Sequence, residues 1–168
     1  VYEKNATVIP SYTLSPSAIS GKILYRRIYS NGTFSDYSES APEEPGEYQC
    51  AYFLGNKSIG EGNIFIDKKE AEIIIDNASL EFTETGITPT AFCEDPNVKV
   101  SYTAFVIDDK GVVTTEEVSI PIKKCGKYSV IAYPKDNTHY KRTYSYAMLE
   151  ITPATPKITI TETNFVYD

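Results

Sequence analysis

The feature that most constrains this chain is an internal repeat that divides it into two copies. The segment Pro42–Tyr48 matches Pro121–Tyr128, with one inserted residue. Gly46 therefore corresponds to Gly126. The spacing of these two glycines exceeds the unit of a solenoid, which is roughly 20–50 residues, and suits a string of small β-sandwiches. We therefore expect the 168 residues to form tandem copies of one small β domain.

Two further matches fix the phase of the repeat. Phe82 corresponds to Tyr2, with the same spacing that separates Gly46 from Gly126. In the middle of each copy, Tyr102 corresponds to Tyr25. By this alignment the opening strand of the first copy would lie before Val1. A small β domain without an edge strand leaves its core open on one side, so we expect another segment to cover it.

The end of the sequence contains a segment similar to such an opening strand. Ile158–Ile160 corresponds to Ile73–Ile75, and the spacing between these two segments is slightly larger than that between Gly46 and Gly126. Residues 154–168 therefore either begin a further repeat of a covalent array or complete the first repeat of another subunit by strand donation. The side chains expected to carry a donor strand are Ile158, Ile160, Phe165 and Tyr167. The expected domains are residues 1–69 (opening strand absent), residues 70–153, and the extra strand 154–168.

Short runs of alternating apolar residues, separated by Pro and Gly, predict β-strands throughout the chain. The expected strands are Lys22–Ser30, Gly46–Leu54, Ile64–Ile66, Val98–Ile107, Glu117–Ile122, Gly126–Tyr133 and Tyr140–Ile151. Tyr140, Tyr144 and Tyr146 share one face of the last strand, and we expect that face to be the core. The alternative is that these rings are exposed and stack on sugars.

Several motifs follow one another in a fixed order along the chain, and some of them are present in both copies. They are Phe82-Thr83 and Tyr167-Asp168, Tyr25 and Tyr102, Pro42–Tyr48 and Pro121–Tyr128, the loop Asp136–Tyr140, and the ending Ile151–Ala154. In this order they resemble the tandem MBG/YDG-type immunoglobulin-like repeats of bacterial surface proteins. The resemblance implies two tandem immunoglobulin-like β-sandwich domains plus a C-terminal extra strand. It also implies an exported adhesin, stalk or fibre without catalytic residues.

A second resemblance concerns the segment Gly46–Cys50. Its Gly-x-Tyr-x-Cys pattern is similar to that of true immunoglobulin domains, in which the Cys bridges the two sheets. That bridge needs an upstream Cys, and none lies before Cys50; the chain also has no Trp to pack on it. In either case we expect Tyr48 and Tyr128 to be structural tyrosines, with a buried ring and a hydroxyl bonded to nearby backbone.

The chain has three cysteines. Cys93 and Cys125 fall in the same repeat, and in an exported protein a disulfide between them is plausible. The alternative is that both are separate thiols that act as small apolar groups. Cys50 lies in an apolar strand, where we expect it to be buried rather than reactive.

The composition leaves few groups for catalysis or for an anionic ligand. The 16 Lys and Arg face 23 Asp and Glu, a net charge of -7, so the chain lacks the basic surface that nucleic acid or anionic lipid requires. No apolar run reaches the ~20 residues that span a bilayer. The single histidine, His139, stands in a polar loop without a nucleophile at a fixed spacing. We therefore expect no enzyme, no nucleic-acid partner and no membrane insertion.

We also expect no cofactor. Acidic pairs at turns, such as Glu94-Asp95 and Asp108-Asp109, offer the oxygen ligands that calcium prefers. Such pairs are usually only solvated, and no D-x-D-x-D-G loop is present. Calcium bound between repeats is the alternative.

Four sites of the form Asn-x-Ser/Thr fall in predicted turns or at strand edges, where a glycan is tolerated. Their asparagines are Asn5, Asn31, Asn56 and Asn77. They predict N-glycosylation if the source organism attaches such glycans.

The sequence thus predicts a non-catalytic structural repeat of an extracellular, cell-surface adhesin, stalk or fibre. Its partners would be neighbouring identical repeats or subunits. The alternatives are an immunoglobulin-like module that binds a carbohydrate or a host protein, and an accessory domain of a larger extracellular enzyme. A contiguous exposed aromatic patch would favour the binding module over the spacer.

Overall fold

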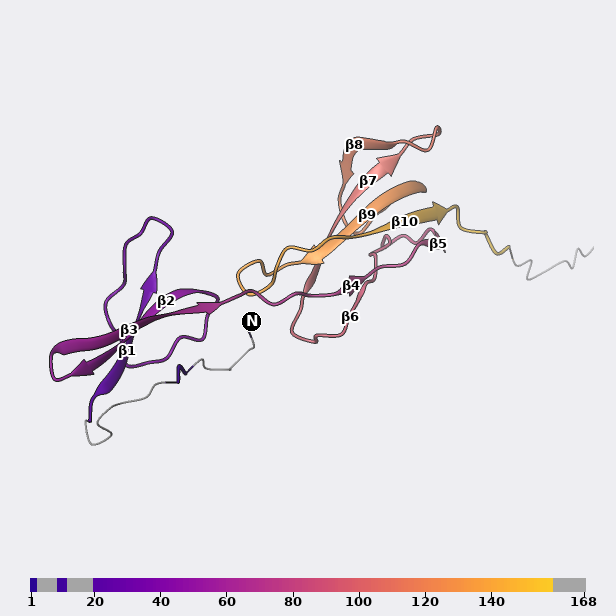
Figure 1. The fold of residues 1–168 in the computed structure, drawn as a ribbon. Helices are drawn as coiled ribbons and strands as arrows, with labels where there is room; N and C mark the ends of the chain where they lie inside the picture. Colours follow the sequence, from indigo (N-terminus) through magenta and orange to yellow (C-terminus); the bar gives the residue numbers. More distant parts are fainter. Residues whose placement is uncertain (3–8, 12–19, 159–168) are drawn as a thin grey trace, which may run out of the picture. The chain divides into compact units, whose positions relative to one another are not determined.

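The computed structural model describes residues 1–2, 9–11 and 20–158 of the chain (Figure 1). Within these residues every regular element is a β-strand and there is no helix, so the all-β prediction is confirmed. The strands are β1 (Lys22–Ile28), β2 (Gly46–Leu54), β3 (Lys57–Ile66), β4 (Ile73–Ile74), β5 (Ala78–Glu81), β6 (Phe92–Cys93), β7 (Val100–Ile107), β8 (Val113–Val118), β9 (Gly126–Pro134) and β10 (Ser145–Thr152).

The chain divides into two compact units. Unit 1 comprises Val1–Ala71 together with Asp136–Arg142, and unit 2 comprises Glu72–Lys135 together with Thr143–Asp168. Unit 1 is therefore discontinuous in sequence, because it includes the segment that connects β9 to β10. The repeat alone places the first boundary after residue 69 and assigns that connecting segment to the second copy.

Unit 1 contains an antiparallel sheet in the order β1-β2-β3. A tight turn at Gly55-Asn56 joins β2 to β3, and Gly55 has a φ of 61°, which glycine adopts without steric cost. The alternating apolar residues of the three strands meet on one face of this sheet. The buried core there is formed by Tyr25, Tyr48, Ile64 and Ile66.

Unit 2 contains a five-stranded sheet in the order β5-β10-β9-β7-β8 and a two-stranded sheet of β4 and β6. β5 runs parallel to β10, and the other neighbours in the larger sheet are antiparallel. The buried core of this unit is formed by Ala104, Ile122, Tyr128, Val130, Leu149 and Ile151.

The two units share a three-strand arrangement. In unit 1 Gly46 pairs with Ile66, and in unit 2 Gly126 pairs with Ile151. The two glycines correspond in the sequence repeat, and the two isoleucines correspond at the larger offset that relates Ile73–Ile75 to Ile158–Ile160. The order β1-β2-β3 in unit 1 therefore corresponds, with the same register, to β7-β9-β10 in unit 2.

The same register corrects one predicted match. Tyr25 pairs with Cys50, and the residue that pairs with the equivalent Val130 is Ala104. Tyr25 thus corresponds to Ala104, not to Tyr102, which lies two residues earlier. A shift of two residues keeps the same face of a strand inward, so the alternation of apolar residues does not detect it.

Three predicted strands differ from the observed ones by more than two residues at one end or both. β3 begins at Lys57 instead of Ile64, and β10 begins at Ser145 instead of Tyr140. The predicted strand Glu117–Ile122 is replaced by β8, which ends at Val118. The residues after β8 leave the sheet, and Ile122 forms an isolated bridge with Ile87 and is buried.

Candidate functional site

Each unit holds one of the predicted structural tyrosines at the start of its central strand. Tyr48 is buried, and its hydroxyl donates a hydrogen bond of 2.9 Å to the carbonyl of Glu44. Tyr128 is buried, and its hydroxyl donates one of 2.8 Å to the carbonyl of Lys124. Burial raises the pKa of both phenols, so they stay protonated and act as donors. In each unit the tyrosine hydroxyl therefore bonds to the carbonyl of the residue four positions earlier. This bond fixes the turn that leads into the central strand, which is β2 in unit 1 and β9 in unit 2.

His139 belongs to an ion-pair cluster within unit 1. Its Nδ1 lies 2.5 Å from Oδ2 of Asp136, and its Nε2 lies 2.5 Å from Oε2 of Glu44. The ring of Tyr2 lies against the imidazole, with centroids 4.6 Å apart. The hydrogen bond to Asp136, followed by the hydrogen bond and charge of Glu44, raises the pKa of His139. The hydrogen bond from His139 likewise lowers the pKa of Asp136.

This geometry engages both imidazole nitrogens, and it makes His139 an ion-pairing group rather than a general base. Glu44 lies 95 residues away in the sequence, so no local pattern links it to His139. Asp136, three residues before His139, was the only part of the cluster that the sequence could indicate.

Further contacts fix the segment Asp136–Arg142 in unit 1. The N–H of Lys69 donates to the carbonyl of His139 at 2.9 Å, and the N–H of Lys141 donates to the carbonyl of Lys69 at 2.8 Å. The ammonium of Lys141 lies 3.2 Å from carboxylate oxygens of both Asp67 and Glu70. These contacts, chiefly the hydrogen bond to Asp67, raise the pKa of Lys141. The segment is thus attached by backbone bonds and by solvent-exposed charge pairs.

The outer face of β10 carries an exposed apolar stripe, which we call the β10 stripe. It consists of Tyr144, just before the strand, with Tyr146 and Met148, which are 48%, 64% and 50% exposed. The prediction that Tyr144 and Tyr146 face the core is therefore wrong, although Tyr140 is buried. The apolar residues on the opposite face of β10, which begin with Ala147, form the core instead.

The reason for this error lies in the sequence of β10 itself. The run from Tyr146 to Leu149 is apolar at every position, so alternation does not indicate which face is inward. Tyr140 is no guide to the strand, because it lies in the part of the chain that belongs to unit 1.

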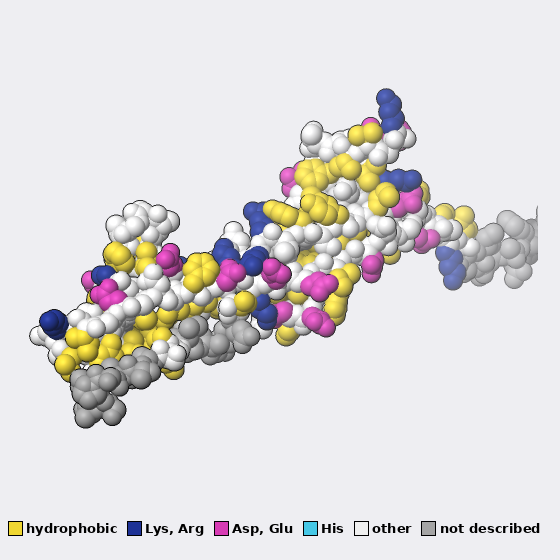
Figure 2. Space-filling model, in the orientation of Figure 1, with side chains coloured by type: hydrophobic (Ala, Val, Ile, Leu, Met, Phe, Trp, Pro, Cys, Tyr) yellow, Lys and Arg dark blue, Asp and Glu magenta, His cyan; other side chains and the backbone are white. Residues whose placement is uncertain are grey.

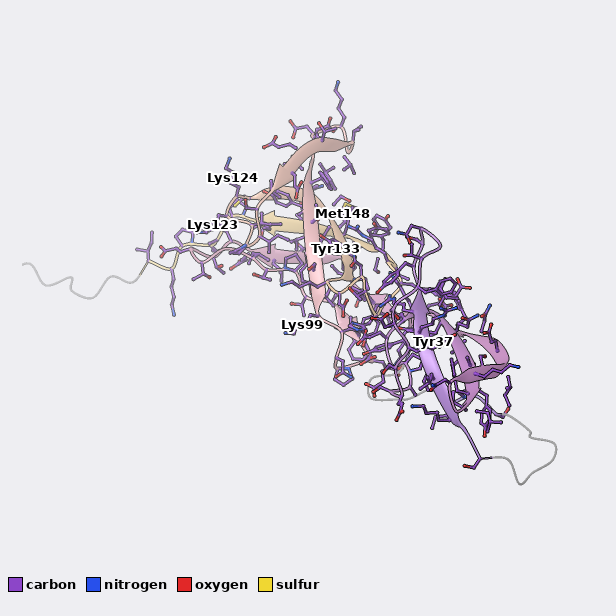
Figure 3. All side chains as sticks on the ribbon, turned by 90° about the vertical axis from the view of Figure 1, so that its left-hand side faces the viewer. Tyr37, Lys99, Lys123, Lys124, Tyr133 and Met148 are labelled. Atoms are coloured by element: carbon purple, nitrogen blue, oxygen red, sulfur yellow. The ribbon has the colours of Figure 1, made fainter. Side chains whose placement is uncertain are left out.

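Other residues extend the β10 stripe across the sheet. The rings of Tyr133 and Tyr144 have centroids 6.0 Å apart, and Ile131 of β9 pairs with Tyr146. The hydroxyls of Tyr133 and Thr103 lie 3.3 Å apart. Hydrophobic side chains are visible on the surface of unit 2 in Figure 2, and Tyr133 is labelled in Figure 3. This face therefore combines aromatic rings with hydroxyl groups.

All three cysteines are free thiols: Cys50 and Cys93 are half-buried, and Cys125 is exposed. Of the two alternatives for Cys93 and Cys125, the structure has them as separate thiols. Cys93 pairs with Ile73 at the start of β4, whereas Cys125 directly precedes Gly126, which pairs with Ile151 near the end of β10.

Three of the four predicted glycosylation asparagines lie among the described residues, and all three are exposed. Asn31 accepts hydrogen bonds from the N–H and the hydroxyl of Thr33, at 3.0 and 2.7 Å. Asn56 lies in the turn between β2 and β3. Asn77 accepts a 2.7 Å hydrogen bond from the N–H of Met148, so its amide is already used at the sheet edge.

The remaining predicted residues lie mostly outside the described part of the chain. Asn5 does, as do Ile160, Phe165 and Tyr167 of the predicted donor strand. Ile158 is described and is 84% exposed.

Within the described residues, His, Cys, Asp and Glu side chains form no group of three or more that could hold a metal ion. These residues also contain no helix long and apolar enough to cross a membrane. No protein-family model and no curated protein sequence matches the chain.

Proposed function

We propose that the chain is a non-catalytic structural repeat of an extracellular surface protein, as part of an adhesin, stalk or fibre. Each repeat would be an immunoglobulin-like β-sandwich. The observation that carries this proposal is the repeated three-strand register, in which Gly46–Ile66 corresponds to Gly126–Ile151. Repetition of one fold with one internal register extends a chain in space without requiring a ligand site.

The chemistry of the most polar cluster supports a structural role. His139 is held between Asp136 and Glu44, and neither of its nitrogens is left to take a proton from a substrate. The two buried tyrosine hydroxyls donate to backbone carbonyls of their own turns. These groups stabilise local structure.

Small-angle X-ray scattering of concatenated chains tests the proposal. Val166 corresponds to Val1, so copies of residues 1–165 joined end to end continue the repeat in phase. A spacer predicts a radius of gyration that grows in near proportion to the number of copies. Growth with about the square root of copy number is the behaviour of a flexible string and would contradict the proposal. Copies of residues 1–158, joined out of phase, serve as the control, and their radius of gyration should grow with about the square root of copy number.

One observation favours a second candidate, a module that binds a carbohydrate or a host protein. The β10 stripe of Tyr144, Tyr146 and Met148 is exposed and continues to Tyr133. Tyrosine rings with adjacent hydroxyls suit the apolar face and the polar edge of a sugar. A glycan array tests this candidate: binding that is lost in Tyr146→Ser and kept in Tyr29→Ser, an exposed tyrosine of unit 1, would favour it. Equal signals from both variants would count against it.

A further inference from the structure

Unit 1 has a pocket at which three cationic side chains gather, and we call it the basic pocket. It has a volume of about 440 Å³ and is lined by Arg27, Pro45, Lys68, Asn137, Thr138 and Arg142. All six residues belong to unit 1, because the last three come from the connecting segment Asp136–Arg142. The described lining contains no carboxylate, although the whole chain has a net charge of -7. The charge of the chain as a whole therefore does not describe this pocket.

The cations of the basic pocket come from different parts of the chain, and local bonds hold two of them in place. Arg27 lies near the end of β1, and its Nη2 donates a 3.1 Å hydrogen bond to the carbonyl of Pro45. Its guanidinium also lies 5.8 Å from the centroid of the Tyr48 ring. Lys68 follows β3, and its ammonium donates to the carbonyl of Asn137. Both cationic groups are thus positioned in advance, which lowers the ordering cost of binding a ligand.

The carboxylates nearest to the basic pocket in the sequence are bound to other cations. Each belongs to a residue that directly precedes a lining residue. Glu44 and Asp136 both contact His139 at 2.5 Å, and Asp67 lies 3.2 Å from the ammonium of Lys141. These three carboxylates therefore pair with His139 and Lys141, and not with the cations of the pocket.

Most hydrogen-bond donors of the basic pocket have no partner among the described residues. There, Arg27 and Lys68 form no ion pair, and the side chain of each makes one hydrogen bond. An arginine side chain carries five N–H donors and a lysine three, so both retain further donors. The hydroxyl of Thr138 and the side-chain amide of Asn137 likewise make no hydrogen bond to a described residue. The pocket thus offers positive charge together with neutral donors.

These donors match a phosphate group. A phosphate monoester carries about 1.5–2 negative charges at pH 7 and has three acceptor oxygens. Arginine binds such oxygens in pairs, and lysine binds them as a point charge. A carboxylate has one charge and two oxygens, so it would compensate the three cations less well. The volume of the basic pocket also falls in the range of small-molecule sites, roughly 300–1,000 Å³, which leaves room for a polar molecule that carries the phosphate.

We propose that the basic pocket binds a phosphate group, either as inorganic phosphate or as the monoester of a small polar molecule. Arg27, Lys68 and Arg142 supply the positive charge, and the hydroxyl of Thr138 donates to a phosphate oxygen. This site goes beyond the structural function proposed above, and neither proposal depends on the other.

Isothermal titration calorimetry of the full chain tests the proposal. The probes are inorganic phosphate, glucose 6-phosphate and glucuronate, at a constant ionic strength of about 50 mM set with chloride, because more salt screens exposed charges. We expect saturable binding at one site for both phosphate probes and weaker binding of glucuronate. Tighter binding of glucose 6-phosphate than of inorganic phosphate would identify a monoester as the ligand, and the reverse order would identify free phosphate.

Three variants test the residues of the basic pocket. Lys68→Gln removes a charge and keeps a donor for the carbonyl of Asn137, Arg142→Gln removes a second charge, and Thr138→Val removes only a hydroxyl. Loss of one hydrogen bond to a charged group corresponds to roughly a tenfold or larger rise in Kd, and we expect this for each variant. Lys57→Gln is the matched control, because it removes an exposed lysine of the same unit that does not line the pocket. Circular dichroism melts verify that each variant is folded.

Three results would overturn the proposal. They are the absence of saturable binding for both phosphate probes, binding of glucuronate as tight as that of phosphate, and a loss of affinity in Lys57→Gln equal to that in Lys68→Gln. The last result would mean that the probes respond to the overall charge of the chain and not to the basic pocket. Small-angle scattering of the concatenated chains tests the structural function separately, so failure of one proposal is distinguishable from failure of the other.

Discussion

The hydroxyl of Tyr128 provides the sharpest test of the packing argument. Tyr128→Phe removes one oxygen and leaves the buried ring in place. The lost bond is a 2.8 Å contact to the carbonyl of Lys124. Tyr48→Phe removes the equivalent 2.9 Å bond to the carbonyl of Glu44. The two repeats thus offer the same experiment twice within one molecule.

The expected cost follows from the burial of each partner. A hydrogen bond between a tyrosine hydroxyl and a backbone carbonyl contributes a net ~0.5–1.5 kcal/mol. Lys124 and Glu44 are exposed, so water reaches the abandoned carbonyl and the cost should stay near ~1 kcal/mol. For a unit of this size, that loss lowers the melting temperature by about 4–8 °C.

Urea and thermal unfolding, followed by the fluorescence of the 14 tyrosines, measure this cost. Tyr128→Phe should destabilise unit 2 and Tyr48→Phe unit 1, and the double variant should show both losses because the sites share no partner. Tyr146→Phe is the control, since this side chain is 64% exposed and should change stability by less than about 0.5 kcal/mol. If Tyr128→Phe unfolds like Tyr146→Phe, the hydroxyl bond does not stabilise the turn and the reasoning is refuted.

Two other predictions concern charge and backbone. Because its carboxylate partners raise the pKa of His139, its contribution to stability should be complete below pH 6.5 and should be lost as pH rises through the raised pKa. The contribution of Asp136, whose pKa is lowered, should disappear at the acid end as pH falls through that lowered pKa. An NMR titration of the single histidine measures the shift, and His139→Gln should flatten the stability curve above pH 6.5; an unshifted titration would contradict the cluster. Gly86→Ala should lower the free energy of unfolding in urea more than Gly111→Ala does. Both glycines have a positive φ, 85° and 78°. Only at Gly86 would the added Cβ also lie 3.0 Å from a backbone atom, the carbonyl oxygen of Ile122. Each carries a strain of roughly 1–2 kcal/mol, so equal losses would show that the crowding at Gly86 is relieved without cost.

The fold could be predicted from the sequence to the level of strands and repeat phase. Gly46–Leu54 was predicted with the bounds that β2 has, because a glycine begins it and a glycine turn ends it. The faces of β10 could not be predicted, because its apolar residues do not alternate with polar ones. The sequence matches Tyr25 with Tyr102, whereas the register matches it with Ala104. This error has a related cause, because residues two positions apart in a strand lie on the same face.

The candidate site was less predictable than the fold. Tyr48 and Tyr128 stood out because a motif repeats around them. The cluster of His139 with Glu44 joins residues that are 95 positions apart, and nothing in either local sequence indicates the contact. Long-range charge pairs of this kind arise from the path of the chain and have no short motif.

The discontinuity of unit 1 explains why the offset between the two copies increases between β9 and β10. β2 passes to β3 through Gly55-Asn56, whereas β9 and β10 are separated by a longer connection that includes Asp136–Arg142. The offset between the copies grows across this connection, and the added residues of the second copy thus complete the fold of the first. A fragment that ends at Ala71 would leave Glu44 without its imidazolium partner and Asp67 without the ammonium of Lys141. The sequence that completes the first unit therefore lies inside the second copy of the repeat, so the boundary between the two units does not coincide with the boundary between the two copies.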